Sequence, residues 1–361
     1  MKKSLSSLEM QGEQIYVVAL GASTAIGRDA WSSAAAVRAG ITGFAQHPYM
    51  IDTAGQPMRI ARAPWLDIDL KGLERFQALL YPAIDQAIEV LLHSHIRLPP
   101  IALALSLPSP RPGLATDFQP RLLRELEGRY SKTFSAVSVF SKGHAAGLLA
   151  LDVVIKKFRE NAFDACVIAG VDSYLEPETL EWLEECDQLH GGGPLNNAWG
   201  FIPGEGAGAV LLARYQIAEY FRFTPLAQVL SAGTAFEPKK IKTQTVCVGK
   251  GLTQAFHGAL TGLLSDTKIT DVYCDMNGEP YRADEFGFAA VRVGEYFESL
   301  SNFVAPADCW GDVSAACGPL HIALASISAY KNYANGHTAV IWASSESGER
   351  GVALLDMTSG K

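Results

Sequence analysis

Two segments rich in small residues constrain the fold of this chain more than any other feature. They span 143–157 and 314–331, and each follows a turn and continues as an apolar helical pattern. Around them, the order strand-helix-strand-helix-strand-strand occurs once before Arg214 and again after Pro225. Such alternation indicates mixed α/β layers. The repeat therefore predicts an internal duplication, in which two sheets enclose 143–157 and 314–331 as a buried central pair of helices.

The predicted elements follow from apolar periodicity and from glycine and proline breakers. In the first half we expect strands at 14–21, 101–107, 137–140, 165–172 and 206–215, and helices at 31–39, 73–93, 118–130, 143–161 and 177–188. In the second half we expect strands at 226–233, 271–276, 339–344 and 352–357, and helices at 252–265, 283–296 and 314–332. Residues 41–64 are predicted as loop and short strand. The run IALALSL at 101–107 is continuously apolar, which is typical of a strand covered on both faces.

Composition limits the classes of function. The chain has 361 residues, and its formal net charge of −8 argues against nucleic acid and anionic membranes as main partners. No apolar run is long enough to span a bilayer, and the N-terminal MKKSLSSLEMQGEQ lacks the apolar core of a secretory signal. The six cysteines form no CxxC pair. We therefore predict free thiols in a cytoplasmic protein, with no metal site and no cofactor.

The turn after 137–140 is the first candidate site. The β-branched run ends at Ser141, small residues follow, and a helix begins at once. Unpaired N–H groups and the positive end of the dipole at a helix start can stabilise an anion, so many enzymes place a nucleophile there. On this stretch alone, a role as a helix N-cap is the better explanation of Ser141.

Several longer motifs together resemble one family. They are VVALGASTAIGRDAW with VRAGITGF, ACVIAGVDSYLEPE, GFIPGEGAGAVLL at 200–212, YCDMNGEP at 273–280 and GDVSAACG at 311–318. Over nearly the whole chain they resemble the β-ketoacyl synthases of the thiolase superfamily, and GFIPGEGAGAVLL is the most specific match. The resemblance implies an α/β thiolase fold with duplicated βαβαβαββ halves in a five-layered αβαβα sandwich. It places the halves at 1–218 and 219–361, as one integrated unit.

The resemblance also implies three site residues, each of which departs from the family pattern. The family's nucleophilic Cys falls on Ser141, its first His on Asn277 and its second His on Asp312. A Ser hydroxyl is a poor nucleophile without a neighbouring base, Asn cannot move a proton, and an anionic Asp opposes a nearby enolate. ASSESGERG replaces the family's C-terminal Gly-Phe-Gly-Gly loop. We therefore expect malonyl decarboxylation to be very slow.

Two hypotheses of function follow from the resemblance. The first is a non-catalytic protein that binds an acyl chain or a protein partner. The alternative is an acyltransferase or hydrolase acting on acyl-carrier protein or acyl-CoA thioesters, with Ser141 as nucleophile. In it, Asp312 is the base and Asn277 the oxyanion donor. His144 is a second candidate base, although we expect it to be a packed or capping residue.

The same resemblance implies partners. An acyl carrier protein or acyl-CoA is expected to bind, and a homodimer is expected through the strand 135–140 before Ser141, because an apolar edge strand needs covering. No nucleic acid and no membrane span are expected. Glu205, within the glycine-rich motif, is predicted to be a structural hydrogen-bond acceptor, and the motif lacks the Lys-Ser/Thr of a phosphate-binding loop.

Overall fold

The computed structural model describes residues 14–92, 101–240, 242–243 and 245–358 of the chain. Its strands form one nine-stranded sheet in the order β5-β4-β6-β7-β1-β8-β11-β10-β9 and a separate hairpin, β2-β3. The first-half strands are β1 (Ile15–Thr24), β2 (Phe44–Ile51), β3 (Pro57–Ala61), β4 (Ile101–Leu107), β5 (Phe134–Ser141), β6 (Ala165–Ser173) and β7 (Glu205–Arg214). The second-half strands are β8 (Ala227–Phe236), β9 (Asp271–Cys274), β10 (Thr338–Ser344) and β11 (Glu349–Asp356).

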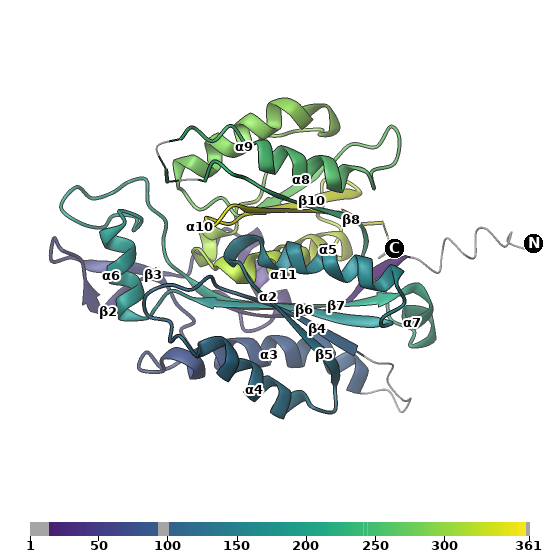
Figure 1. Cartoon of the computed structure of the whole chain (residues 1–361), viewed down its shortest axis with the longest axis horizontal. Helices are drawn as coiled ribbons and strands as arrows, with labels where there is room; N and C mark the ends of the chain where they lie inside the picture. Colours follow the sequence, from purple (N-terminus) through teal and green to yellow (C-terminus); the bar gives the residue numbers. More distant parts are fainter. Residues whose placement is uncertain (1–13, 93–100, 241, 244, 359–361) are drawn as a thin grey trace, which may run out of the picture.

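The helices lie between and outside the strand layers (Figure 1). They are α2 (Ala30–Arg38), α3 (Gly72–Leu92), α4 (Phe118–Tyr130), α5 (Ala146–Arg159), α6 (Pro177–Glu185), α7 (Tyr215–Tyr220), α8 (Lys250–Leu260), α9 (Pro280–Val293), α10 (Ala307–Trp310) and α11 (Cys317–Tyr330). Short 3₁₀ turns, η1 (Gly143–Ala145) and η3 (Ser314–Ala316), lead directly into α5 and α11, and η2 (Gly294–Tyr296) follows α9.

The two halves of the sheet enclose α5 and α11, as the sequence predicts. The first-half strands β5-β4-β6-β7-β1 lie on one side of the two helices, and the second-half strands β8-β11-β10-β9 lie on the other (Figure 1). A short antiparallel ladder, which pairs Ile15 with Val229 and Val17 with Ala227, joins the halves at β1 and β8. The core between the layers takes side chains from both halves, such as Leu148, Leu320 and Ile341. This core makes the two halves one packed unit.

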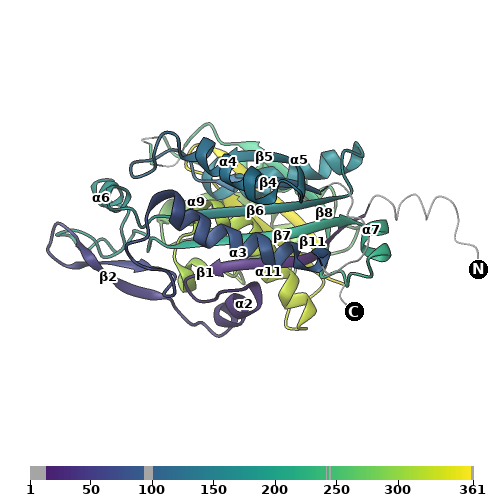
Figure 2. The same ribbon diagram turned by 90° about the horizontal axis from the view of Figure 1, so that it is seen from below.

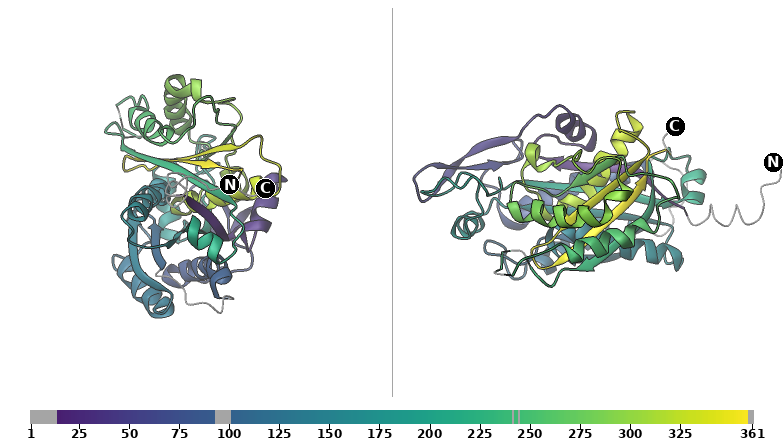
Figure 3. Two further views of the ribbon diagram at one scale, coloured as in Figure 1. Left: turned by 90° about the vertical axis from the view of Figure 1, so that its right-hand side faces the viewer. Right: turned by 90° about the horizontal axis from the view of Figure 1, so that it is seen from above.

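Outer helices complete the five layers. Helices α3 and α4 cover the free face of the first-half strands, where Phe76, Leu80 and Leu122 are fully buried (Figure 2). Helices α8 and α9 cover the second-half strands, where Phe256 and Trp342 are buried (Figure 3). The predicted α/β class and the five αβαβα layers are therefore confirmed.

Some boundaries differ from the sequence prediction. Residues 41–64, expected as loop and short strand, form the hairpin β2-β3, which projects from the layers beside α6 (Figure 1). Helix α8 ends at Leu260, because the chain then turns through 261–265. The predicted end of the 73–93 helix at position 93 lies outside the described residues. No helix in the described ranges has the length and apolar character needed to cross a bilayer.

Candidate active-site cavity

The two 3₁₀ turns, η1 and η3, place the site. Each turn begins with a residue in the left-handed region, Gly143 at φ +66° and Ser314 at φ +37°. Helices α5 and α11 then cross backbone to backbone, because a Cβ on Gly147 would lie 2.8 Å from Pro319 Cδ and one on Gly318 would lie 2.9 Å from Gly147 Cα. This close crossing requires glycine. It brings the residues just before the two helices, from opposite halves of the chain, into contact.

His144 and Asp312 meet at this crossing. His144 Nε2 lies 2.9 Å from Asp312 Oδ1 and 2.8 Å from Oδ2. Asn277 donates a hydrogen bond from Nδ2 to Asp312 Oδ2 at 2.6 Å, and the backbone N–H of Ser314 donates to Oδ1 at 2.8 Å. His144, Asn277 and Asp312 are all buried. Both oxygens of the Asp312 carboxylate therefore accept hydrogen bonds.

Electrostatics keep Asp312 ionised. Burial alone would raise the pKa of the Asp312 carboxyl, but the His144 ring, the Arg282 guanidinium and the Asn277 amide hold that pKa well below its usual range. An ionised carboxylate can only accept hydrogen bonds, so Nε2 of His144 carries the proton. Arg282 Nη2 lies 3.2 Å from the same Nε2. Since both of these nitrogens are donors, this is a packing contact and not a hydrogen bond.

A second ring of buried charges surrounds this pair. Arg282 donates to Asp275 Oδ2 at 2.6 Å. Glu279 accepts from Asn277 Nδ2 at 3.1 Å and from the Tyr281 hydroxyl at 2.6 Å, and it lies 3.0 Å from Lys242 Nζ. The side chains around His144 and Asp312 are thus fixed by neighbours that are themselves paired.

A cavity of about 310 Å³ opens beside His144. Its polar wall includes Arg111, Lys142 and Glu346, and its apolar wall includes Tyr174 and Phe201. The guanidinium of Arg111 pairs with Asp172 at 2.6 Å. Lys142 Nζ lies 2.7 Å from Glu349, and about half of the Lys142 side chain is exposed. The cavity therefore combines an apolar surface with cationic groups near its polar side.

The loop between β10 and β11 braces the turn before His144. Ser345, in this loop, accepts a hydrogen bond from the backbone N–H of Ala145 at 2.9 Å and donates one to the carbonyl of Lys142. The side chain of Ser345 is almost completely buried. Residues 142–145 are therefore held on both sides, by the glycine crossing and by Ser345.

Of the three predicted site residues, two lie together in the structure and Ser141 lies apart from them. Asn277 and Asp312 are in contact, but Ser141 lies at the end of β5, where its hydroxyl donates to Gln119 Oε1 at 2.7 Å. Ser141 is not among the residues that line the cavity. His144, expected as a packed or capping residue, occupies the place beside Asp312. Ser141 therefore does not face Asn277 and Asp312, because four residues, 142–145, separate the end of β5 from the start of α5.

The sequence does hold a signal for His144. GHAAG and SAACG both run from the left-handed turn residue to the glycine at the helix crossing, in 143–147 and 314–318. In the first half of the chain, the residue after the left-handed Gly143 is His144, and its side chain lies in the site. The prediction for Glu205 is confirmed, since it accepts from Arg75 at 2.6 Å, the Ala63 N–H at 2.8 Å and the Ser173 hydroxyl at 2.9 Å.

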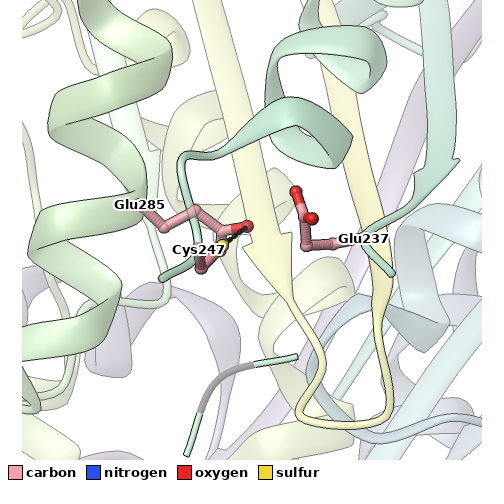
Figure 4. A group of neighbouring side chains, drawn as sticks. All are labelled: Glu237, Cys247 and Glu285. Carbon is pink, nitrogen blue, oxygen red and sulfur yellow. Dashed lines mark hydrogen bonds between the residues drawn. The ribbon is translucent and has the colours of Figure 1, made fainter. Parts of the chain in front are cut away.

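A second cluster contains metal-ligating residue types (Figure 4). Ligand atoms of Glu237, Cys247 and Glu285 all lie within 4.8 Å of one another. Glu237 accepts the N–H of Gly251 at 2.7 Å at the start of α8, and Glu285 accepts from Arg350 at 2.7 Å and from the Cys247 thiol at 3.7 Å. Burial raises the pKa of Cys247, which favours the thiol over the thiolate that binds metals. These contacts assign the cluster a structural role.

Comparisons with known proteins agree with this arrangement. Residues 136–218, which include His144 and Glu205, match the β-ketoacyl synthase N-terminal domain. No curated protein sequence matches the chain. The matched segment of the chain is thus similar to the N-terminal domain of β-ketoacyl synthases.

Solved structures give the same fold over most of the chain. One is a chain from "AntDE:AntF (apo): type II PKS acyl-carrier protein in complex with its ketosynthase bound to the hexaketide", with TM-score 0.77 and 15% identity, covering 95% of this chain and 98% of that one. A second is from the ishigamide ketosynthase/chain length factor, with TM-score 0.72 and 17% identity, covering 95% and 99%. A third is the module 6 ketosynthase of the bacillaene synthase from Bacillus subtilis 168, with TM-score 0.74 and 15% identity, covering 95% and 72%. At these identities the likeness establishes the fold.

Proposed function

We propose that this chain is a non-condensing ketosynthase-like protein, which binds an acyl thioester or a ketosynthase partner without forming an acyl-enzyme. One observation carries the proposal: the turn where the family's nucleophile is expected presents His144, bound to an anionic Asp312. An imidazole tied to a carboxylate does not store an acyl chain as a thiolate does. Asp312 and Asn277, at the predicted positions of the two catalytic His residues, supply no imidazole for decarboxylation.

The remaining thiols near the site do not replace the missing nucleophile. Cys317 begins α11 and is buried, and burial raises its pKa well above the usual range. Cys274 lies buried on β9, where burial likewise raises the pKa. Both thiols therefore stay protonated at neutral pH. All six cysteines are free, which supports the predicted reducing, cytoplasmic setting.

The cavity supports thioester binding. It is large enough for the end of an acyl chain or of a pantetheine arm, and its walls are partly aromatic. The ammonium of Lys142 stands at this cavity and is about half exposed, so it can meet a phosphate. A ketosynthase with the same fold has been solved with its acyl-carrier protein, which supports a carrier-borne substrate for this chain.

Strand β5 supports a dimer. It pairs only with β4 within the described chain, so its outer edge is open, and Val137, Val139 and Phe140 are only half-buried. An edge of this kind is a template for another strand. We propose a homodimer through 135–140. One structural neighbour is a ketosynthase/chain length factor. If this chain instead pairs with an active ketosynthase, the homodimer proposal is wrong.

The alternative with Ser141 as nucleophile is less well supported. Its hydroxyl is engaged with Gln119, and neither Asp312 nor His144 contacts it. A Ser hydroxyl without a base in contact is a poor nucleophile. This hypothesis predicts an acyl adduct that disappears in Ser141→Ala.

Intact-mass measurement tests the proposal. The protein is incubated with acyl-CoA and with acyl-loaded carrier protein, and release of CO₂ from malonyl thioester is measured in parallel. We expect no adduct and no decarboxylation above buffer, together with saturable binding of a non-hydrolysable acyl-CoA thioether. A covalent adduct, or release of CO₂ from malonyl thioester above buffer, would overturn the proposal.

A further inference from the structure

We infer that His144, held by Asp312, is a general base that activates water to hydrolyse an acyl thioester in the 310 Å³ cavity. The inference rests on the thioester binding proposed above and adds a reaction to it. A protein without a thiol cannot store the acyl chain, but a positioned imidazole can still deliver water to it.

The hydrogen bonds around the His144 ring leave one nitrogen available. Nε2 donates to Asp312, which fixes the tautomer, so Nδ1 of the neutral ring carries a lone pair. Within the described residues, Nδ1 has no hydrogen-bond partner, whereas each of the neighbouring charged groups is paired. His144 lines the cavity. The ring is therefore anchored on one side and presents a proton acceptor on the other.

The surroundings suit a base that becomes charged for a short time. Asp312 lies against Nε2 and stabilises the imidazolium that forms when Nδ1 takes a proton. Asp312 is itself held by Asn277 and by the Ser314 N–H, so little reorganisation is needed. Arg282, 3.2 Å from Nε2, opposes the positive ring, but Asp275 partly neutralises Arg282 at 2.6 Å. In this reaction Asp312 is a positioning residue.

The cavity has room for both reactants. The cavity of about 310 Å³ reaches the lower end of the range of small-molecule pockets, about 300–1,000 Å³, so a water molecule fits beside an acyl group. The apolar side, with Tyr174 and Phe201, is suited to the acyl chain. Lys142 lines the polar side, where its ammonium can bind the phosphate of the carrier. The thioester carbonyl is then placed near the polar end, close to the His144 ring.

The proposed step is balanced. A water molecule gives a proton to Nδ1 of His144 while its oxygen bonds to the carbonyl carbon of the thioester. The tetrahedral intermediate collapses, the carbon–sulfur bond breaks, and the proton passes from Nδ1 to the departing sulfur. The products are a carboxylic acid and a thiol, with no change of oxidation state. No acyl-enzyme forms, in keeping with the proposed function.

The test measures release of free thiol from acyl-CoA with a thiol reagent. We expect wild-type hydrolysis above buffer, and His144→Gln to lower kcat by about 100-fold while KM changes less than threefold, since a general base contributes 10²–10⁴-fold. His257→Gln, at an exposed histidine on α8, is the matched control and should keep the wild-type rate. In His144→Ala, added imidazole should restore part of the rate, which a purely structural role of His144 does not predict. Asp312→Asn should lower kcat and leave KM nearly unchanged.

Three results would overturn the inference. They are no hydrolysis by a wild-type protein that binds the acyl-CoA thioether, hydrolysis that survives His144→Gln, and hydrolysis that depends on Ser141 instead. The first leaves the proposed function standing, because binding is retained. If the thioether does not bind either, the proposed thioester binding fails together with the inference. Circular dichroism of each variant separates loss of chemistry from loss of fold.

Discussion

Replacing Asp312 with Asn is the most direct test of the charge network at the helix crossing. The substitution keeps the size of the side chain and removes one negative charge that faces His144 and Arg282. Removing one partner of a buried ion pair costs about 3–5 kcal/mol, because the other charge stays buried without compensation. Arg282 keeps Asp275 at 2.6 Å and Glu279 at 3.6 Å. We therefore expect the lower end of the range, about 3 kcal/mol of unfolding free energy.

The pH dependence gives this prediction a sign. The folded-state pKa of Asp312 lies below the unfolded value of about 3.9, so the unfolded chain binds more protons between the two values. The stabilisation by Asp312 is complete above about pH 3.9 and is lost as the pH falls from there through the folded-state pKa. At pH 3 the loss is about 1.2 kcal/mol, since one pKa unit equals 1.36 kcal/mol. Asp312→Asn removes this part of the pH dependence.

Urea unfolding followed by circular dichroism measures both effects. Free energies of unfolding are compared for wild type and Asp312→Asn at pH 7, pH 5 and pH 3. Asp308→Asn is the matched control, because Asp308 is exposed on α10 and makes no ion pair within the described chain; its substitution should change stability by no more than about 0.5 kcal/mol. If Asp312→Asn is no more destabilising than Asp308→Asn at pH 7, the carboxylate does not hold the site together and the reasoning is wrong.

Three further predictions concern the helix crossing, the nucleophile position and the edge strand. Gly147→Ala should cost about 1–3 kcal/mol in urea unfolding, because its Cβ would lie 2.8 Å from Pro319, whereas Gly287→Ala, with no atom within 4 Å, should be neutral or stabilising by up to about 1 kcal/mol. His144→Cys should form a slow covalent adduct with acyl-CoA, seen as a mass increase, if position 144 is where this fold places its nucleophile. Val139→Lys on β5 should shift the protein from dimer to monomer in light scattering at unchanged helical content; an unchanged mass would place the interface elsewhere.

The layered fold follows from the sequence because its signals are local and repeated. Continuous apolar runs such as 101–107 predict strands covered on both faces, and β4 is indeed buried throughout. Small residues at 143–157 and 314–331 predict the central helices, and Gly147 and Gly318 meet there. Strand order and the β1–β8 ladder are not local. They depend on how strands distant in sequence pair, which periodicity does not encode.

The candidate site was predictable only in part. Asn277 and Asp312 are in contact, and each lies within one of the motifs that carry the resemblance, YCDMNGEP at 273–280 and GDVSAACG at 311–318. The step from Ser141 to His144 depends on how many residues the turn uses before the helix begins, and the left-handed Gly143 sets this number. A glycine can take up either hand, so its presence alone does not reveal the conformation. The pairing of His144 with Asp312 joins residues 168 apart in sequence and requires the helix crossing to be known.

The composition of the site is itself evidence about its use. The site buries four polar or charged side chains together, His144, Asp312, Arg282 and Asp275. Removing such groups from water costs free energy of folding. Replacing buried ion pairs by apolar residues of similar size is often neutral or raises the stability by about 1–4 kcal/mol. A cavity that no longer acted on anything could be filled in this way. This cavity instead keeps about 310 Å³ open beside a histidine whose second nitrogen is unpaired within the described chain. Local departures from optimal packing concentrate at functional sites. The retained charges thus favour a changed chemistry at His144 over a site that has merely lost its function.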